Sequence, residues 1–260
     1  MRMRMRISML LLAIIVTTGI FMTGPEQAQA YVLPQDPAEP VITLDFQGSR
    51  LKRIDDAPTL SILANGTVVM PQSYAHSKAY EDQISEAELQ ELLDFIIREN
   101  RFFNYDSETV EAKLSTMERQ PLPVHFSTTV ISVNADNRSK LVRSDALGHG
   151  PMVEETEQLL AIKKRLEQLM SVVKLGGRDE VTSWLTIANK EFGLKSLEGA
   201  SLMPASDAPL KSEDLQSVGR WDDGSMYVRF LRREGARSTI VTINITAEGE
   251  RHVTVAGDGD

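Results

Sequence analysis

The chain contains no cysteine, and this constrains its possible folds more than any other feature of the sequence. Without thiols there can be no disulfide, no thiolate zinc site, no covalently attached haem and no cysteine nucleophile. A lipid anchor on an N-terminal cysteine is excluded for the same reason. The fold must therefore be stabilised by an ordinary apolar core, and small disulfide-rich scaffolds are ruled out.

The first 30 residues have the three parts of a cleavable secretory signal peptide. Three arginines open the chain, an apolar run follows over residues 7–22, and the small residues Ala28 and Ala30 suit the pockets of a signal peptidase. We expect cleavage before Tyr31. The alternative is a retained membrane anchor, but an anchor requires about 20 apolar residues and this run is shorter and interrupted. Both readings carry the rest of the chain out of the cytoplasm, into the periplasm or the medium.

The charge balance argues against two classes of partner. The formal net charge is −9 at pH 7, and the leader itself is positively charged, so the exported part is more acidic still. An acidic protein has little affinity for nucleic acid or anionic lipid. We therefore expect neither nucleic acid nor, after cleavage, a membrane as a partner.

The hydrophobic patterning predicts an α+β fold of two small units, in which helices cover antiparallel hairpins and a meander. Residues 31–40 are a proline-rich spacer, 41–175 an N-terminal domain and 178–260 a C-terminal domain. The boundary is expected at Gly176-Gly177.

Three local patterns organise the N-terminal domain. Asn65-Gly66, between two apolar runs, predicts a hairpin with a primed turn, because both residue types tolerate positive φ. Ser85 and Glu88 form a capping box that begins a helix ending near Asn100. The longest helix spans 154–174 and closes on an αL cap at the two glycines. Its apolar stripe covers only about two heptads, so packing on the domain's own sheet is favoured over a coiled coil.

The remaining elements are a second helix and further strands. A shorter helix begins at Ser107 and places Val110, Leu114 and Met117 on one side. In the C-terminal domain an apolar stripe predicts a helix that ends at Gly193. A meander follows, with strands expected at 215–221, 225–232, 238–246 and 251–256.

Two resemblances accompany this pattern. Residues Ile84 to Tyr105, which follow a hairpin with a glycine turn, resemble uncharacterised exported bacterial proteins, and this implies no particular activity. The helix and meander of the C-terminal domain are similar in outline to cystatin-like folds. The inhibitors' Gln-x-Val-x-Gly loop is absent, because the stretch from Gln216 to Gly219 lacks the residue between valine and glycine. No inhibitory residue is therefore carried over.

No motif in the chain predicts an enzyme. Nucleotide-binding glycine loops, a zinc-binding HExxH and a serine elbow are all missing, and the acid-amide turn at 134–137 lacks the rest of a calcium loop. We expect no cofactor and no metal. Among the four histidines, His149 is the best candidate for a general base, because it lies between glycines soon after Asp145. A hydrolase with an unrecognised site near His149 is one alternative function, and a small-ligand carrier is another.

Basic residues gather around the tip of one predicted hairpin of the C-terminal domain. They are Arg229, Arg232, Arg233 and Arg237, with Trp221 nearby in the sequence. In an acidic chain such a cluster can dock a partner's carboxylates through bidentate contacts, although a solvated hairpin tip is the simpler explanation. We expect a non-catalytic envelope or extracellular binding module, whose partner is a protein or an envelope component.

Overall fold

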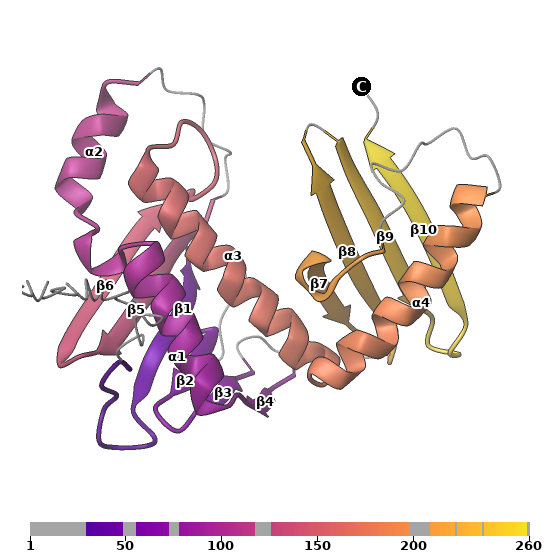
Figure 1. Cartoon of the computed structure of the whole chain (residues 1–260), viewed down its shortest axis with the longest axis horizontal. Coiled ribbons are helices and arrows are strands. Elements are labelled where there is room, and N and C mark those ends of the chain that lie inside the picture. The colour runs from indigo at the N-terminus through magenta and orange to yellow at the C-terminus, as the bar shows by residue number, and fades with distance from the viewer. Residues whose placement is uncertain are drawn as a thin grey trace, which may run out of the picture. The chain divides into compact units, whose positions relative to one another are not determined.

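The computed structural model describes residues 30–48, 56–72, 78–117, 126–197, 209–221, 223–235 and 237–258, and it shows the expected α+β fold. Residues Tyr31–Asp260 form one compact unit. Two antiparallel sheets and their helices make up this unit (Figure 1). Ala28 and the rest of the leader up to residue 29 lie outside the described residues.

The first sheet has six antiparallel strands in the order β4-β3-β2-β1-β5-β6. Its strands are β1 Pro40–Gln47, β2 Leu60–Leu63, β3 Thr67–Met70, β4 Tyr80–Gln83, β5 Thr128–Ala135 and β6 Arg138–Asp145. Ile42 and Leu44 on β1 face Val133 and Ile131 on β5, and all four are fully buried. They belong to the first hydrophobic cluster.

The hairpin at Asn65-Gly66 is present, but its expected primed turn is wrong. Only Gly66 has a positive φ, 84°, and its N–H donates to the carbonyl of Leu63 at 2.9 Å. The loop has three residues, 64–66, for which an ordinary turn followed by a left-handed residue is the usual solution. The primed-turn conformation occurs instead in the two-residue loop Asp136-Asn137 between β5 and β6, where φ is 54° and 55°.

In the described part of the chain, four helices accompany the sheets, and two short helical turns lie between the first two of these helices. They are α1 Glu86–Asp94, which continues as a π-helical turn Phe95–Glu99, a 3-10 turn Phe102–Asn104, α2 Ser107–Ser115, α3 Glu154–Leu175 and α4 Arg178–Leu197. Of these, α4 belongs with the second sheet rather than the first. The predicted capping box is confirmed, since Ser85 Oγ accepts from Glu88 N–H and Glu88 accepts from Ser85 N–H. The predicted αL cap of α3 is confirmed at Gly176, where φ is 108°.

Two expectations about helices are wrong. Met117 does not share the buried side of α2, because that helix ends at Ser115 and Met117 is 39% exposed. The last helix does not end at Gly193 but continues to Leu197. Glycine weakens a helix interior by only about 1 kcal/mol, and helix-forming residues follow Gly193.

The second sheet has four antiparallel strands in the order β10-β9-β8-β7. Its strands are β7 Leu215–Arg220, β8 Met226–Glu234, β9 Arg237–Ile245 and β10 Arg251–Asp258, preceded by a 3-10 turn Ser212–Asp214. Figure 1 shows α4 against this sheet. Val181, Trp184 and Ala188 of α4 pack in one hydrophobic cluster with Val228 and Phe230 of β8.

The C-terminal end of α3 also belongs to this second cluster. Leu175 is buried within the cluster and Val172 packs against it, whereas Leu159 and Ile162 of the same helix belong to the first cluster. One long helix therefore supplies apolar side chains to both cores. The predicted boundary at Gly176-Gly177 stays a prediction.

Candidate functional site

Alternation along the strands divides the second sheet into a buried face and an exposed one. Because successive side chains of a strand point to opposite faces, Val228 and Phe230 face the core while their neighbours Tyr227, Arg229 and Leu231 face away. The strand pairing extends this second face over the other three strands. We call it the open face, and it consists of Ser217, Gly219, Tyr227, Arg229, Leu231, Arg233, Ser238, Ile240, Thr242, Asn244, His252, Thr254 and Ala256.

An aromatic pair lies at one end of the open face. Trp221, directly after β7, is 49% exposed, and its ring centroid lies 5.5 Å from that of Tyr227. The Tyr227 ring lies close against the backbone of β7, since a Cβ added to Gly219 would come within 2.2 Å of it. Glycine inside a strand is typical of such a close approach. The sheet is therefore built to hold an aromatic platform at its surface.

The four arginines predicted as a partner-binding cluster do not share one environment. Arg229 and Arg233 are exposed on the open face, and the Arg229 guanidinium lies 5.7 Å from the Tyr227 ring centroid. Neither makes an ion pair among the residues that the structure describes. The side chain of Arg237 lies outside the described ones.

Arg232 points to the opposite face and is only 7% exposed, so it does not belong to an exposed cluster. Its guanidinium donates to Asp214 Oδ2 at 3.0 Å and to the carbonyl of Pro209. The sequence contained the relevant pattern, because Arg232 continues the alternation of Met226, Val228 and Phe230. Arg232 is thus part of the packing beneath the sheet.

Acidic residues are absent from the open face where its side chains are described, and two carboxylates of the adjoining loops, Asp223 and Glu250, have partners. Asp223 accepts from the N–H of Ser225 at 2.8 Å and from its hydroxyl, and the hydroxyl bond is the main reason why the pKa of Asp223 is lowered. Glu250 lies 3.8 Å from the imidazole of His252. Asp258 ends the row that contains Arg233 and Ser238, and its side chain is not among the described ones. Arg229 and Arg233, which make no ion pair among the described residues, give the described part of this face a positive charge.

His149, the predicted general base, lies in the loop after β6. It lines a hollow of about 370 Å³ together with Ser127, Lys163 and Glu167, and its own side chain is exposed. Glu167 pairs with Lys163 at 3.0 Å. In the described ranges no hydrogen bond joins the imidazole to a hydroxyl or a carboxylate. The hollow thus contains the residue types of a hydrolase without a hydrogen-bonded catalytic triad.

A second cavity, of about 380 Å³, is lined by parts of α1, α3 and α4. Apolar side chains such as Leu92 and Val172 share its wall with several charged ones, and Glu88 forms an ion pair there with Arg178. A carrier of apolar ligands calls for a predominantly apolar wall. The small-ligand carrier therefore stays a prediction, and the charged side chains in the wall of this cavity do not favour it.

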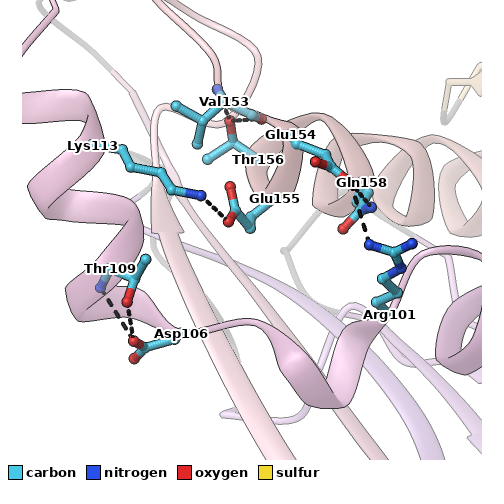
Figure 2. A network of polar contacts seen from close by, with 9 residues as sticks. All are labelled: Arg101, Asp106, Thr109, Lys113, Val153, Glu154, Glu155, Thr156 and Gln158. Atoms are coloured by element: carbon cyan, nitrogen blue, oxygen red, sulfur yellow. Dashed lines mark hydrogen bonds and ion pairs between the residues drawn. The ribbon is translucent and has the colours of Figure 1, made fainter.

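A polar network joins α2 to the beginning of α3 (Figure 2). Lys113 of α2 forms an ion pair with Glu155, and Arg101 lies 3.5 Å from Glu154. Thr156 caps α3 by accepting from the N–H of Val153 at 2.9 Å. Acidic side chains in the first turn of a helix interact favourably with its dipole. We interpret this network as structural, since its groups bind one another around a helix terminus.

The described residues contain no group of histidines and acids that could hold a metal ion. Within the same ranges, none of the helices combines the length and the apolar character that crossing a membrane requires. No protein family, curated protein or solved structure was found to match the chain.

Proposed function

We propose that this chain is an exported, non-catalytic binding module that holds its partner on the open face of the second sheet. The observation that carries the proposal is the exposed aromatic pair of Trp221 and Tyr227 with Arg229 beside it. Tryptophan, tyrosine and arginine are the residue types that most often dominate the binding energy of protein interfaces. Gly219 lets the tyrosine ring lie close against the neighbouring strand.

The N-terminal end of the compact unit supports the exported part of the proposal. The unit begins at Tyr31, the residue expected to follow signal-peptide cleavage. Its N–H donates to Gln90 Oε1 at 2.7 Å, and its carbonyl accepts from Gln90 Nε2 at 3.0 Å. An α-amino group at the same position would still be able to donate to Gln90 after cleavage.

Affinity capture tests the proposed function. The exported form is immobilised and exposed to the envelope fraction of its own source, and bound proteins and envelope components are identified by mass spectrometry. We expect a specific partner whose capture falls at least about tenfold for Trp221→Ala, because truncation of an aromatic anchor removes 2 kcal/mol or more of binding energy. Leu141→Ala is the matched control, since Leu141 is 53% exposed on the other sheet. Equal capture by wild type and both variants would contradict the proposal.

The hollow beside His149 favours hydrolysis as a second candidate function, because it brings together a histidine, a serine and a glutamate. Such residues support acyl transfer when the histidine activates the hydroxyl. The exported form would then hydrolyse a chromogenic ester. His149→Ala and Ser127→Ala would each lower the rate of hydrolysis to about the same low level. Activity that is absent, or equal in all three proteins, removes this candidate.

A further inference from the structure

We propose that the partner site on the open face takes an extended acidic protein segment, with carboxylates four residues apart and an apolar residue midway between them. This inference rests on the proposed function and names the chemistry of its partner. It follows from the order of side chains along β8, which is Tyr227, Arg229, Leu231 and Arg233. Aromatic, cationic, apolar and cationic groups thus succeed one another on one face of a single strand.

The spacing of these groups determines the repeat of the ligand. Side chains on one face of a strand recur every second residue, about 6.7 Å apart, so the two guanidinium groups originate about 13 Å from each other. An extended peptide lying along β8 has the same repeat. Its carboxylates at positions i and i+4 would therefore reach Arg229 and Arg233 together, and the side chain at i+2 would lie over Leu231.

Charge favours an acidic segment over a neutral or basic one. Arg229 and Arg233 are exposed and make no ion pair within the described ranges, whereas Arg232 between them is neutralised by Asp214. Guanidinium groups pair with carboxylates through two parallel hydrogen bonds. A positive surface on a chain with net charge −9 also attracts acidic partners that the rest of the molecule repels.

The apolar part of the face favours a protein segment over an acidic polysaccharide. Leu231 pairs with Ile240 on β9, and Ala256 on β10 extends this row, so an apolar strip separates the two arginines. An apolar side chain at i+2 of a peptide fills such a strip, whereas the hydroxyl groups around the rim of a sugar ring would find no hydrogen-bond partner on it. The aromatic pair at the end of the strand offers a further contact for an apolar side chain at i−2.

Fluorescence anisotropy with synthetic peptides tests the inference. The probe is the labelled heptapeptide Trp-Thr-Glu-Thr-Val-Thr-Glu, titrated with the exported form together with its reversed sequence, since the direction of the chain is open. We expect saturable binding of one or both, weakened about tenfold by Arg229→Ser or Arg233→Ser, because each substitution removes charge-assisted hydrogen bonds. Arg143→Ser, on the first sheet, is the matched control and should leave the affinity unchanged.

Reversing the charges of the protein and of the peptide together distinguishes a loss of recognition from a loss of folding, because only a folded variant can bind the reversed peptide. The double variant Arg229→Glu with Arg233→Glu should release the glutamate peptide and bind the corresponding peptide with lysines in place of both glutamates. A peptide with the two glutamates adjacent should bind the wild type about tenfold less tightly than the spaced one, because only one carboxylate can then reach an arginine.

Several results would overturn the inference. They are the absence of binding to any of these peptides at about 1 mM protein, equal affinity for the glutamate and lysine peptides, or binding of a uronic acid polymer in place of the peptides. If capture from the envelope still depends on Trp221 while the peptides fail, the binding role stands and only the acidic segment is excluded. If capture does not depend on the open face, the proposed function fails as well.

Discussion

The arginines of β8 differ in environment because they alternate between the two faces of one strand. Arg232 faces the core, where its guanidinium binds Asp214 and the carbonyl of Pro209. Arg233, the next residue, is exposed. A substitution at each of these neighbouring positions should therefore affect a different property of the protein, stability at one and binding at the other.

Arg232→Ala should destabilise the fold by about 3 kcal/mol, because it leaves the Asp214 carboxylate largely buried without its counter-charge. Urea unfolding monitored by circular dichroism measures this loss. Arg233→Ala is the matched control, and it should change stability by no more than about 0.5 kcal/mol. The pair Arg232→Met with Asp214→Asn should recover at least half of the loss, since no unpaired charge then remains. A single variant as stable as the wild type would contradict the structural role.

The capping box of α1 makes part of the stability dependent on pH. The pKa of Glu88 is lowered, mainly by the hydrogen bond from the N–H of Ser85 and also by its hydroxyl and by Arg178. A carboxyl group whose pKa is lower in the folded state contributes stability above its unfolded pKa, and this contribution disappears as the pH falls through the folded value. The contribution of Glu88 is therefore present at pH 7 and lost on acidification.

Glu88→Gln should reduce stability by about 1 kcal/mol at pH 7. The difference from the wild type should begin to shrink below about pH 4.3, the ordinary pKa of glutamate, and should disappear as the pH passes the lower folded value. Urea unfolding at a series of pH values measures this. Glu91→Gln, on an exposed position of the same helix, removes one charge without touching the cap and should have less than half the effect at pH 7. A Glu88→Gln loss that does not shrink anywhere between pH 7 and about pH 2 would show that the carboxylate is not responsible.

A glycine that ends a helix stabilises it, whereas a glycine inside a helix weakens it. Gly176 ends α3 with φ at 108°, a conformation that side chains disfavour, and an added Cβ would lie 3.3 Å from Glu180 Cγ. Gly193 lies inside α4, and an added Cβ there would meet no atom within 4 Å. The same substitution should therefore weaken one helix end and strengthen the other helix.

Gly176→Ala should destabilise the protein by about 1 to 2 kcal/mol, because alanine cannot adopt the left-handed conformation without strain. Gly193→Ala should stabilise it by about 0.5 to 1 kcal/mol, because alanine loses less backbone entropy in a helix. Thermal unfolding of the two variants beside the wild type gives both signs in one experiment. Shifts in the same direction would contradict the assignment of one glycine as a cap and the other as an interior residue.

The elements themselves could largely be predicted from the sequence, whereas the turn at Asn65-Gly66 and the open face could not. Turn type depends on the length of the loop, and the third loop residue, Ala64, becomes evident only once strand pairing places the end of β2 at Leu63. The aromatic pair requires the pairing of Gly219 with Tyr227, which joins residues of two different strands. A glycine within a predicted strand was the one available indication of that close approach.

At the scale of the whole molecule, the N-terminal end of the compact unit is fixed by contacts from distant parts of the chain. Gln90 of α1 binds both backbone groups of Tyr31, and the Tyr31 hydroxyl donates to Asp94 at 3.3 Å. Val32 is held in the same way by Asp136 in the turn between β5 and β6. The residue proposed to follow the cleavage site is thus anchored to the compact unit through its backbone and its side chain.

N-terminal sequencing of the exported protein tests this boundary, and we expect it to begin at Tyr31. Gln90→Ala should leave the cleavage site unchanged, because a signal peptidase recognises Ala28 and Ala30 in the unfolded leader. The same variant should lower the free energy of unfolding of the exported form by about 1 to 2 kcal/mol, because it removes two hydrogen bonds from Tyr31. Gln158→Ala, an exchange of the same kind on α3, is the matched control and should have less than half that effect. An intact Met1 in the exported protein would contradict cleavage, whereas a start at Tyr31 with no stability loss in Gln90→Ala would leave cleavage standing and exclude only the anchoring of the new N-terminus.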